Sequence, residues 1–138
     1  MAGPDPTILT AIDRASARTG VPVSVLRAAA YRESRFNPKA VNGKTSATGL
    51  FQILDGTWSN EKGTGLLDRY GAKHGLNSGT TRFDPYASAV MAAEYASENA
   101  ALIQKKLGRK ARPGELYVSH FMGGAGAVKL INAYNKSP

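Results

Sequence analysis

Apolar residues recur at helical spacing along most of this chain, and turn-forming or polar residues separate the apolar stretches. A period near 3.6 residues is typical of amphipathic helices. The pattern predicts about six helices, some of them short, and at most a small β-hairpin, so the expected fold class is mainly α. The longer predicted helical segments are residues 6–18, 22–34, 63–74, 85–107, 114–122 and 126–133, and residues 55–58 open a further short helix.

Acidic residues, prolines and glycines mark the ends of these segments. Asp5, Asp55 and Asp84 stand at predicted helix starts, where a carboxylate can accept hydrogen bonds from free N–H groups. Pro85 falls in the first turn of the longest predicted helix, where its missing N–H costs little. The glycine pair Gly123-Gly124 is expected to break the C-terminal helical region in two.

Glu33 lies near the end of the second predicted helix, on the same stripe as Ala29 and Ala30. A carboxylate against alkyl groups loses solvation, which raises its pKa. A raised pKa lets a carboxylic acid hold its proton near neutral pH, as a general acid must. The same spacing fits a buried glutamate that pairs with Arg32 or Arg35, and the periodicity alone leaves both interpretations open.

The stretch after this helix combines a turn with an apolar segment around one amide. Asn37-Pro38 ends the helix, because a residue before proline is disfavoured in the helical region. Asn42-Gly43-Lys44 is a turn signal, so residues 39–48 form either the tip of a short hairpin or an irregular loop. Gln52 follows among apolar residues, where its amide is either a positioned hydrogen-bonding group or a strand-edge side chain that faces water.

Two other side chains have more than one interpretation. Trp58 is the only tryptophan, and it is either a core residue or a platform on which a sugar ring stacks. Glu94 lies beside the apolar face of the 85–107 helix, where it is either partly buried or solvated. Sequence periodicity does not separate these alternatives.

The composition is that of a globular protein. The chain has 138 residues, 42% of them hydrophobic, so we expect one domain over 1–138 with a core of its own. No apolar run reaches the roughly 18 residues that a membrane-spanning helix needs. There is no cysteine, and the two histidines, His74 and His120, are far apart. We therefore expect no disulfide, no metal site and no cofactor.

The chain is strongly basic, with a formal net charge of +8. Such a charge favours anionic partners, among them nucleic acid, acidic lipid and cell-wall polymer. The densest basic segment, residues 105–112, is either a solvated helix end or an electrostatic patch. The N-terminal residues lack the basic and apolar regions of a secretory signal, so the protein is expected to be cytoplasmic when made, exported by another route, or an excised mature domain.

Several motifs in register resemble those of the soluble lytic transglycosylases of the lysozyme-like superfamily. In that family a catalytic Glu-Ser pair is followed by Asn-Pro and by a Gly-Leu-Met-Gln segment. Here Glu33-Ser34, Asn37-Pro38 and Gly49-Leu50-Phe51-Gln52 stand in that order, and Asp84-Pro85 looks like the start of the family's later Asp-Pro helix. The resemblance covers residues 22–135 and implies a lysozyme-like helical fold.

The family's third motif, Ala-Tyr-Asn-Ala-Gly, is degenerate in this chain. The segment His120-Phe121-Met122-Gly123-Gly124 falls at its place, so Phe121 replaces the tyrosine. The tyrosine hydroxyl of the family is expected to hydrogen-bond near the catalytic acid, which Phe121 cannot do. Either that contact is absent or another hydroxyl supplies it. The tyrosines that could do so are Tyr95, Tyr117 and Tyr134.

The resemblance also implies roles for individual residues. Glu33 would be the catalytic acid, and Gln52 would bind the substrate or its N-acetyl group. Asn42 or Ser46 would lie near the acid, and Phe51 with Leu54 would form the cleft wall. The implied substrate-binding residues are Ser34, Asn42, Ser46, Phe51, Gln52, Leu54, Tyr95, Phe121 and Tyr134.

The implied reaction cleaves the β-1,4 bond between N-acetylmuramic acid and N-acetylglucosamine in peptidoglycan. Glu33 would protonate the glycosidic oxygen, and the substrate's 2-acetamido carbonyl would stabilise the anomeric carbon. Ionised Glu33 would then take the proton of the sugar's 6-hydroxyl as it closes a 1,6-anhydro ring. A typical glycosidase needs a second carboxylate. None lies between Glu33 and Gln52, and Asp55, the nearest, looks like a helix cap.

Two alternatives remain at the level of sequence. A lysozyme of the same fold would use water and need a base. The residues that could serve as that base are Glu61, Asp68, Asp84 and Glu94. A non-catalytic module that binds cell wall or nucleic acid is supported by the charge alone.

We therefore expect a monomeric wall-degrading enzyme with peptidoglycan strands and the anionic envelope surface as partners, and no nucleic acid. It would act in the periplasm or outside the cell. It would be either a bacterial enzyme or a phage protein, such as an endolysin, released through a separate pore or carried in a virion.

Overall fold

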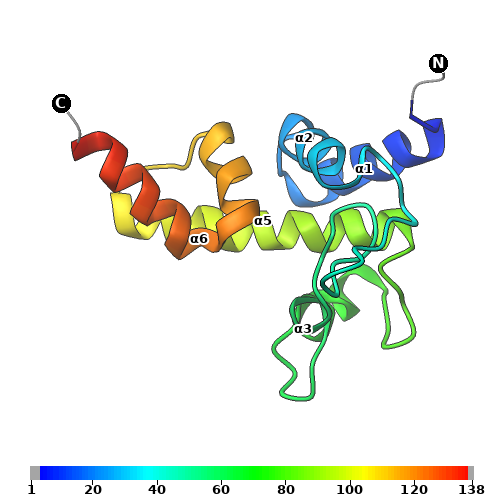
Figure 1. The fold of residues 1–138 in the computed structure, drawn as a ribbon. Helices are drawn as coiled ribbons and strands as arrows, with labels where there is room; N and C mark the ends of the chain where they lie inside the picture. Colours follow the sequence, from blue (N-terminus) through cyan, green and yellow to red (C-terminus); the bar gives the residue numbers. More distant parts are fainter. Residues whose placement is uncertain (1–3, 137–138) are drawn as a thin grey trace. The chain divides into compact units, whose positions relative to one another are not determined.

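A computed structural model describes the backbone of residues 4–136 and the side chains of that range, apart from those at positions 117, 118, 120–123, 125 and 134–136. The described range forms six α-helices and one short 3-10 helix and contains no β-strand (Figure 1). The elements are α1 (Pro6–Thr19), α2 (Val23–Ser34), α3 (Asp55–Trp58), α4 (Leu66–Tyr70), η1 (Ala72–His74), α5 (Pro85–Leu107) and α6 (Pro113–Lys136). The predicted mainly helical, lysozyme-like fold class is confirmed.

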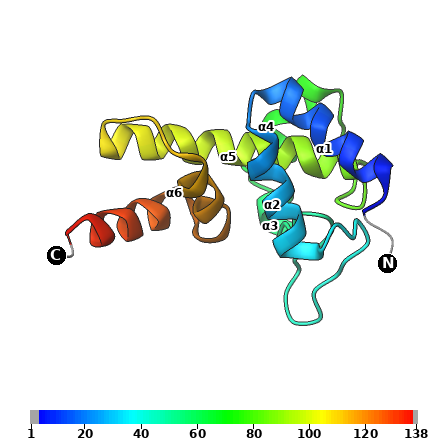
Figure 2. The ribbon, with the colours of Figure 1, turned by 90° about the horizontal axis from the view of Figure 1, so that it is seen from above.

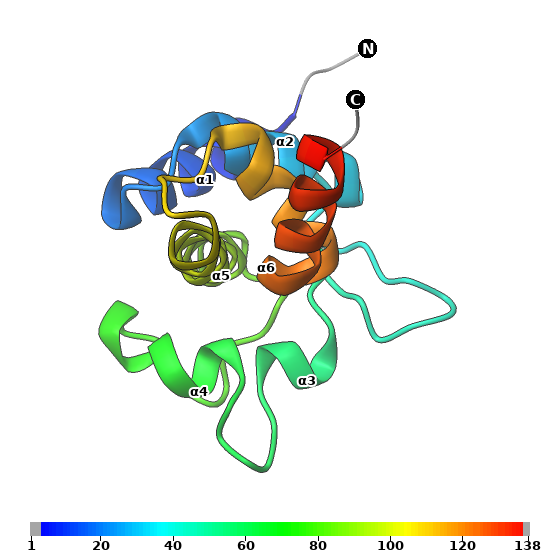
Figure 3. The same ribbon diagram turned by 90° about the vertical axis from the view of Figure 1, so that its left-hand side faces the viewer.

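The chain divides into two compact units, Met1–Glu94 and Tyr95–Pro138. The first unit contains the helices from α1 to η1 and the beginning of α5, and the second contains the remainder of α5 and α6. Figure 3 shows α5 end-on as one continuous helix. The expectation that the whole chain forms a single catalytic domain stays a prediction.

The first unit is built on α1 and α2, which pack against each other. Asp5 caps α1 as predicted, since the Thr7 N–H donates to Asp5 Oδ1 at 2.9 Å. Arg14 of α1 lies over the ring of Tyr86 of α5, 4.3 Å from its centroid, so the beginning of α5 joins the same unit. The buried apolar residues of α1, α2 and this part of α5 are Ile8, Ala11, Ile12, Ala15, Val25, Leu26, Ala29, Ala30, Ala87, Ala89, Val90, Met91, Ala92 and Ala93.

The segment predicted as one helix over 63–74 is shorter and divided. α4 begins after Gly65, whose N–H donates to Asp68 Oδ2 at 2.9 Å. The Asp68 carboxylate also accepts from Ser59 Oγ at 2.7 Å and from the Asn60 N–H at 3.0 Å. These bonds tie the preceding loop to the helix start, which prevents the helix from beginning earlier.

Asp55 does not cap α3, contrary to the prediction. The N-cap position belongs to Leu54, and no side chain caps this helix. The Asp55 carboxylate is instead paired with the guanidinium of Arg82. Asp55 therefore forms a long-range ion pair instead of the predicted helix cap.

The chain between α2 and α3 is an irregular loop, drawn in cyan in Figures 1 and 2. It contains two isolated antiparallel bridges, Val41 with Thr48 and Thr48 with Ile53. Of the two predicted possibilities, the irregular loop is therefore the one observed. We call residues 46–54 of this loop the wall segment.

The second unit pairs the later part of α5 with α6. The predicted break at the glycine pair Gly123-Gly124 is wrong, because α6 runs unbroken from Pro113 to Lys136. A Cβ at Gly124 would lie 2.7 Å from Leu102 Cδ2 and 3.0 Å from Asn99 Oδ1. The glycine thus allows α6 to approach α5 closely, and that packing offsets its low helix propensity. Ile103, Ala127 and Val128 form the core of this unit.

Candidate active site

Glu33 occupies the last turn of α2, where the helix ends in an unusual conformation. Arg35 and Phe36 follow with φ of 51° and 65°, two consecutive non-glycine residues in the left-handed region. Such residues are uncommon and cost free energy unless local bonds hold them. Here the Arg35 N–H donates to Tyr31 O at 2.9 Å, and the Phe36 N–H donates to Ala30 O at 3.3 Å. The chain therefore turns sharply away directly after Glu33.

The environment of Glu33 fits that of an acid that keeps its proton. Its side chain is partly buried, and loss of solvation raises the pKa of its carboxyl, while the charge of Arg32 acts in the opposite direction. Its carboxylate makes no hydrogen bond or ion pair with any described residue, and this holds for the neighbouring Arg32 and Arg35. Of the two sequence interpretations, the desolvated carboxyl is the one observed.

Ser34 connects the end of α2 to the wall segment. Its Oγ donates to Leu50 O at 2.7 Å, lies 3.1 Å from Ala30 O, and accepts from the Asn37 N–H at 3.2 Å. The hydroxyl of Ser34 thus links the residue after Glu33 to the wall segment by a hydrogen bond. Its predicted contact with the substrate stays a prediction.

Gln52 lies in the wall segment with its amide nitrogen turned into the loop. Its Nε2 donates to Gly49 O at 2.9 Å and to Ala40 O at 3.1 Å, and its backbone is left-handed with φ of 52°. The amide is therefore a positioned hydrogen-bonding group, as one of the two sequence interpretations holds. Whether its carbonyl oxygen binds an N-acetyl group stays a prediction.

Asn42 and Ser46 both bond to backbone within the loop. Asn42 Oδ1 accepts from the N–H groups of Lys44 at 2.7 Å and Thr45 at 3.0 Å, which forms the predicted turn. Ser46 Oγ accepts from the Asp55 N–H at 2.9 Å. Both side chains shape the loop, and their expected proximity to the substrate stays a prediction.

Phe51 and Leu54, the two residues expected to line the cleft wall, differ in exposure. The side chain of Leu54 is 47% exposed, whereas Phe51 is only 1% exposed. Phe51 is therefore buried, and its expected place in the cleft wall stays a prediction.

The remaining expected substrate residues belong to the second unit. Tyr95 is partly buried in α5. The side chains of Phe121 and Tyr134, and that of Tyr117, lie outside the described side chains. The roles expected for these residues stay predictions.

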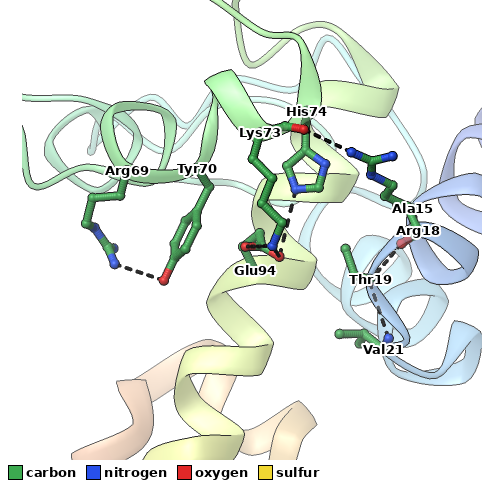
Figure 4. A network of polar contacts seen from close by, with 9 residues as sticks. All are labelled: Ala15, Arg18, Thr19, Val21, Arg69, Tyr70, Lys73, His74 and Glu94. Carbon is green, nitrogen blue, oxygen red and sulfur yellow. Dashed lines mark hydrogen bonds and ion pairs between the residues drawn. The ribbon is translucent and has the colours of Figure 1, made fainter.

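Glu94, a candidate second carboxylate, is buried and forms an ion pair with the exposed side chain of Lys73. It is 6% exposed, and Lys73 Nζ lies 3.3 Å from both of its carboxylate oxygens. His74 Nε2 lies 3.8 Å from Glu94 Oε1, and the imidazole is 1% exposed. Figure 4 shows the two side chains of η1 converging on Glu94. The buried interpretation of Glu94 is therefore correct, and its carboxylate is occupied within the first unit.

The other candidate bases are occupied or exposed. Asp84 caps α5, since its Oδ1 accepts from the Ala87 N–H at 2.9 Å. Asp68 caps α4, and Asp55 pairs with Arg82. Glu61 is exposed and without a described partner. Glu33 is thus the one carboxylate in the described part of the chain that is both partly buried and without a partner.

Arg82 is a structurally important residue that sequence reasoning missed. Arg82 Nη1 donates to Ser46 O at 2.8 Å and to Ile53 O at 2.6 Å, so this side chain holds both ends of the wall segment. The only sequence signal for Arg82 is its place just before the Asp84-Pro85 helix start, and that signal does not reveal its partners.

A comparison with protein families agrees with this arrangement. The family model described as the transglycosylase SLT domain matches residues 10–137, nearly the whole chain. This chain belongs to the transglycosylase SLT domain family. The resemblance to lytic transglycosylases is thereby confirmed, and the activity of an SLT domain is lytic transglycosylase activity on peptidoglycan.

An SLT domain acts on the cell wall, so its place of action is the periplasm or the cell exterior. None of the helices within residues 4–136 combines the length and the apolar character that a membrane span requires. Among the side chains that the structure describes, no three histidine or acidic groups gather as metal ligands would.

Proposed function

We propose that this SLT domain cleaves the β-1,4 bond between N-acetylmuramic acid and N-acetylglucosamine with Glu33 as its single catalytic carboxyl group. The observation that carries the proposal is the state of Glu33, which is partly buried, raised in pKa and without a partner among the described residues. A group in that state holds a proton at a pH where an ordinary glutamate has lost it.

The reaction proceeds in two proton transfers at the same carboxyl group. Protonated Glu33 donates to the glycosidic oxygen, and the bond from that oxygen to C1 of the muramic residue breaks. The 2-acetamido carbonyl of the substrate stabilises the positive C1. The 6-hydroxyl then attacks C1 and gives its proton to the Glu33 carboxylate, which restores the acid and closes the 1,6-anhydro ring.

The occupation of the other carboxylates supports this one-acid scheme. A hydrolase would need a second carboxylate to activate water or to attack C1. Asp55, Asp68, Asp84 and Glu94 are each engaged by a cation or by backbone N–H groups. The acceptor in the proposed reaction is the substrate's own hydroxyl, which requires no further base.

The setting of the reaction follows from the charge and the family. We propose a monomer that acts outside the cytoplasmic membrane and is held on the anionic envelope by its net charge of +8. A phage-encoded wall-degrading protein and a bacterial enzyme both fit this description.

The test compares Glu33→Gln with Glu61→Gln, because these two carboxylates lack described partners and differ in burial. Release of soluble fragments from purified peptidoglycan is expected to fall by roughly 10²–10⁴-fold in Glu33→Gln. Glu61→Gln is expected to match the wild type. Unchanged release by a folded Glu33→Gln variant would exclude Glu33 as the acid.

A further inference from the structure

The side chain of Arg82 makes three polar contacts, two with the wall segment and one with the first residue of α3. Its side chain is 17% exposed, and its Nη1 donates to the carbonyl oxygens of Ser46 and Ile53 at 2.8 and 2.6 Å. Its Nη2 pairs with the carboxylate of Asp55, whose side chain is 70% exposed. The two carbonyl contacts are therefore the more sheltered part of this arrangement.

The backbone of Arg82 is fixed as tightly as its side chain. Its carbonyl oxygen accepts from Ser88 Oγ at 2.7 Å, and Ser88 is fully buried in α5. The same carbonyl lies 2.2 Å from the position that a Cβ on Gly49 would occupy. Gly49 also has φ of 85°, so this contact requires a glycine on two grounds. The wall segment thus lies directly on the backbone that leads into α5.

A short chain of contacts connects this anchor to Glu33. Ser46 and Ile53, which Arg82 binds, flank the turn that carries Leu50 and Gln52. Leu50 O accepts from Ser34 Oγ at 2.7 Å, and Ser34 directly follows Glu33. All of these residues belong to the first compact unit.

We propose that Arg82 is a positioning residue for the reaction: it fixes the wall segment against the start of α5 and thereby sets the distance between Gln52 and Glu33. This inference rests on the proposed function of Glu33. Arg82 touches no reacting atom, and it acts through the turn at Leu50 and the hydroxyl of Ser34.

A lysine cannot take this role. A guanidinium presents several N–H donors in a fixed plane, whereas an ammonium is a compact charge on a flexible stem. Lysine at position 82 would retain the charge, and so the net charge of the protein. It would not hold two carbonyl oxygens and a carboxylate in fixed directions. Arg82→Lys therefore removes the positioning without changing the electrostatic attraction to an anionic wall.

The test measures kcat, KM and the pH profile of kcat on purified soluble glycan strands for wild type, Arg82→Lys and Arg27→Lys. Arg27 is the matched control, because it is exposed and its ion pair with Asp13 joins α2 to α1 and not to the wall segment. In Arg82→Lys we expect kcat to fall roughly 10- to 100-fold with a smaller change in KM, since loss of alignment acts on the transition state. Arg27→Lys is expected to match the wild type.

The pH profile separates positioning from simple loss of stability. If the wall segment loosens, water reaches Glu33, its pKa returns toward the ordinary value, and the basic limb of kcat moves to lower pH. Exchange of the Thr48 and Ile53 amide hydrogens, which bond to each other's carbonyl oxygens at 3.2 Å, should quicken in the same variant.

Two results would overturn the inference. One is an Arg82→Lys variant with wild-type kcat, pH profile and amide exchange. The other is a loss of activity that equals the unfolded fraction measured at the assay temperature. If the wild-type protein produces no anhydro-muropeptides, that result counts against the proposed function and not against this inference. The amide exchange of Arg82→Lys would then still show whether Arg82 holds the wall segment.

Discussion

At the scale of single residues, the proposed chemistry depends on the partial burial of the Glu33 carboxyl and on its lack of a partner among the described residues. Burial raises the pKa of this carboxyl, and the positive charge of Arg32 lowers it. Because Arg32 is exposed, the effect of its charge is partly screened by water. Substitution of Arg32 is therefore expected to change the pKa of Glu33.

Arg32→Gln should raise the pKa of Glu33 further above that of an ordinary glutamate. The acid would keep its proton to a higher pH, so the basic limb of kcat/KM should move upward, while the acidic side stays the same. The measurement is the pH profile on soluble glycan strands. Arg27→Gln removes the same charge from the same helix and should leave the limb in place. A downward shift in Arg32→Gln would contradict this account.

The position of Glu33 follows from the sequence, whereas most of its surroundings do not. Helical periodicity places Glu33 on the buried stripe of α2, as observed. The bonds of Arg82 join residues 29 and 36 positions apart, which no local pattern encodes. Asp55 shows the same limit, because its helix-start position predicts a cap and its partner is Arg82.

At the scale of elements, the wall segment is an irregular loop held by specific contacts instead of a ladder of strand hydrogen bonds. Two isolated bridges, the bonds of Arg82 and the glycine at position 49 define its path. Sequence predicts a turn here, but it does not predict which glycine the path requires. Of the two glycines in the loop, Gly43 has no atom within 4 Å of an added Cβ, and Gly49 has a backbone oxygen at 2.2 Å.

Gly49→Ala should destabilise the protein by about 2–4 kcal/mol, from a strained left-handed backbone and a clash with Arg82 O. Gly43→Ala should change the free energy of unfolding by less than about 0.5 kcal/mol, as surface substitutions usually do. Urea unfolding of both variants measures the difference. Equal stabilities would show that the wall segment does not lie on the Arg82 backbone as described.

The contact between η1 and α5 makes stability depend on pH. Burial lowers the pKa of His74, with Arg18 and Lys73 acting in the same direction and Glu94 opposing them. Below the unfolded-state value of 6.5, the unfolded chain binds a proton that the folded chain resists. The free energy of unfolding should therefore decrease on acidification, by at most about 1.4 kcal/mol per pH unit from this one group.

His74→Gln should remove that part of the pH dependence. The measurement is urea unfolding of wild type and variant at pH 8, 6.5 and 5.5, and the quantity compared is the change of stability with pH. Below pH 6.5 the free energy of unfolding should fall more steeply with decreasing pH in the wild type than in His74→Gln. Parallel curves over the whole range would mean that the pKa of His74 is the same in the folded and unfolded states.

At the scale of the whole molecule, the net charge of +8 is what would attract the protein to an anionic wall in the proposed setting. Within residues 105–112, Arg109 is neutralised by Glu115, whose carboxylate lies 2.7 and 2.8 Å from it and has its pKa lowered to about 2. Lys105, Lys106 and Lys110 in the same segment are exposed. The segment thus combines a structural ion pair with solvent-facing cations.

Half-molar salt should reduce activity on whole cell wall more than activity on a short soluble glycan. Salt at that concentration shortens the screening length to a few ångströms, which weakens attraction between the basic protein and an extended anionic surface. Initial rates on both substrates with and without added salt give the comparison. An equal reduction on both would count against attraction by the surface.

The measurement that tests the central claim most directly is mass spectrometry of the soluble products that the wild-type protein releases from purified peptidoglycan. The proposed one-acid mechanism predicts muropeptides that are lighter by one water than the reducing form, because C6–OH closes the ring in place of water. Glu33→Gln should release none of them. Reducible muramic ends would contradict the account, since they form when water attacks C1 in place of C6–OH.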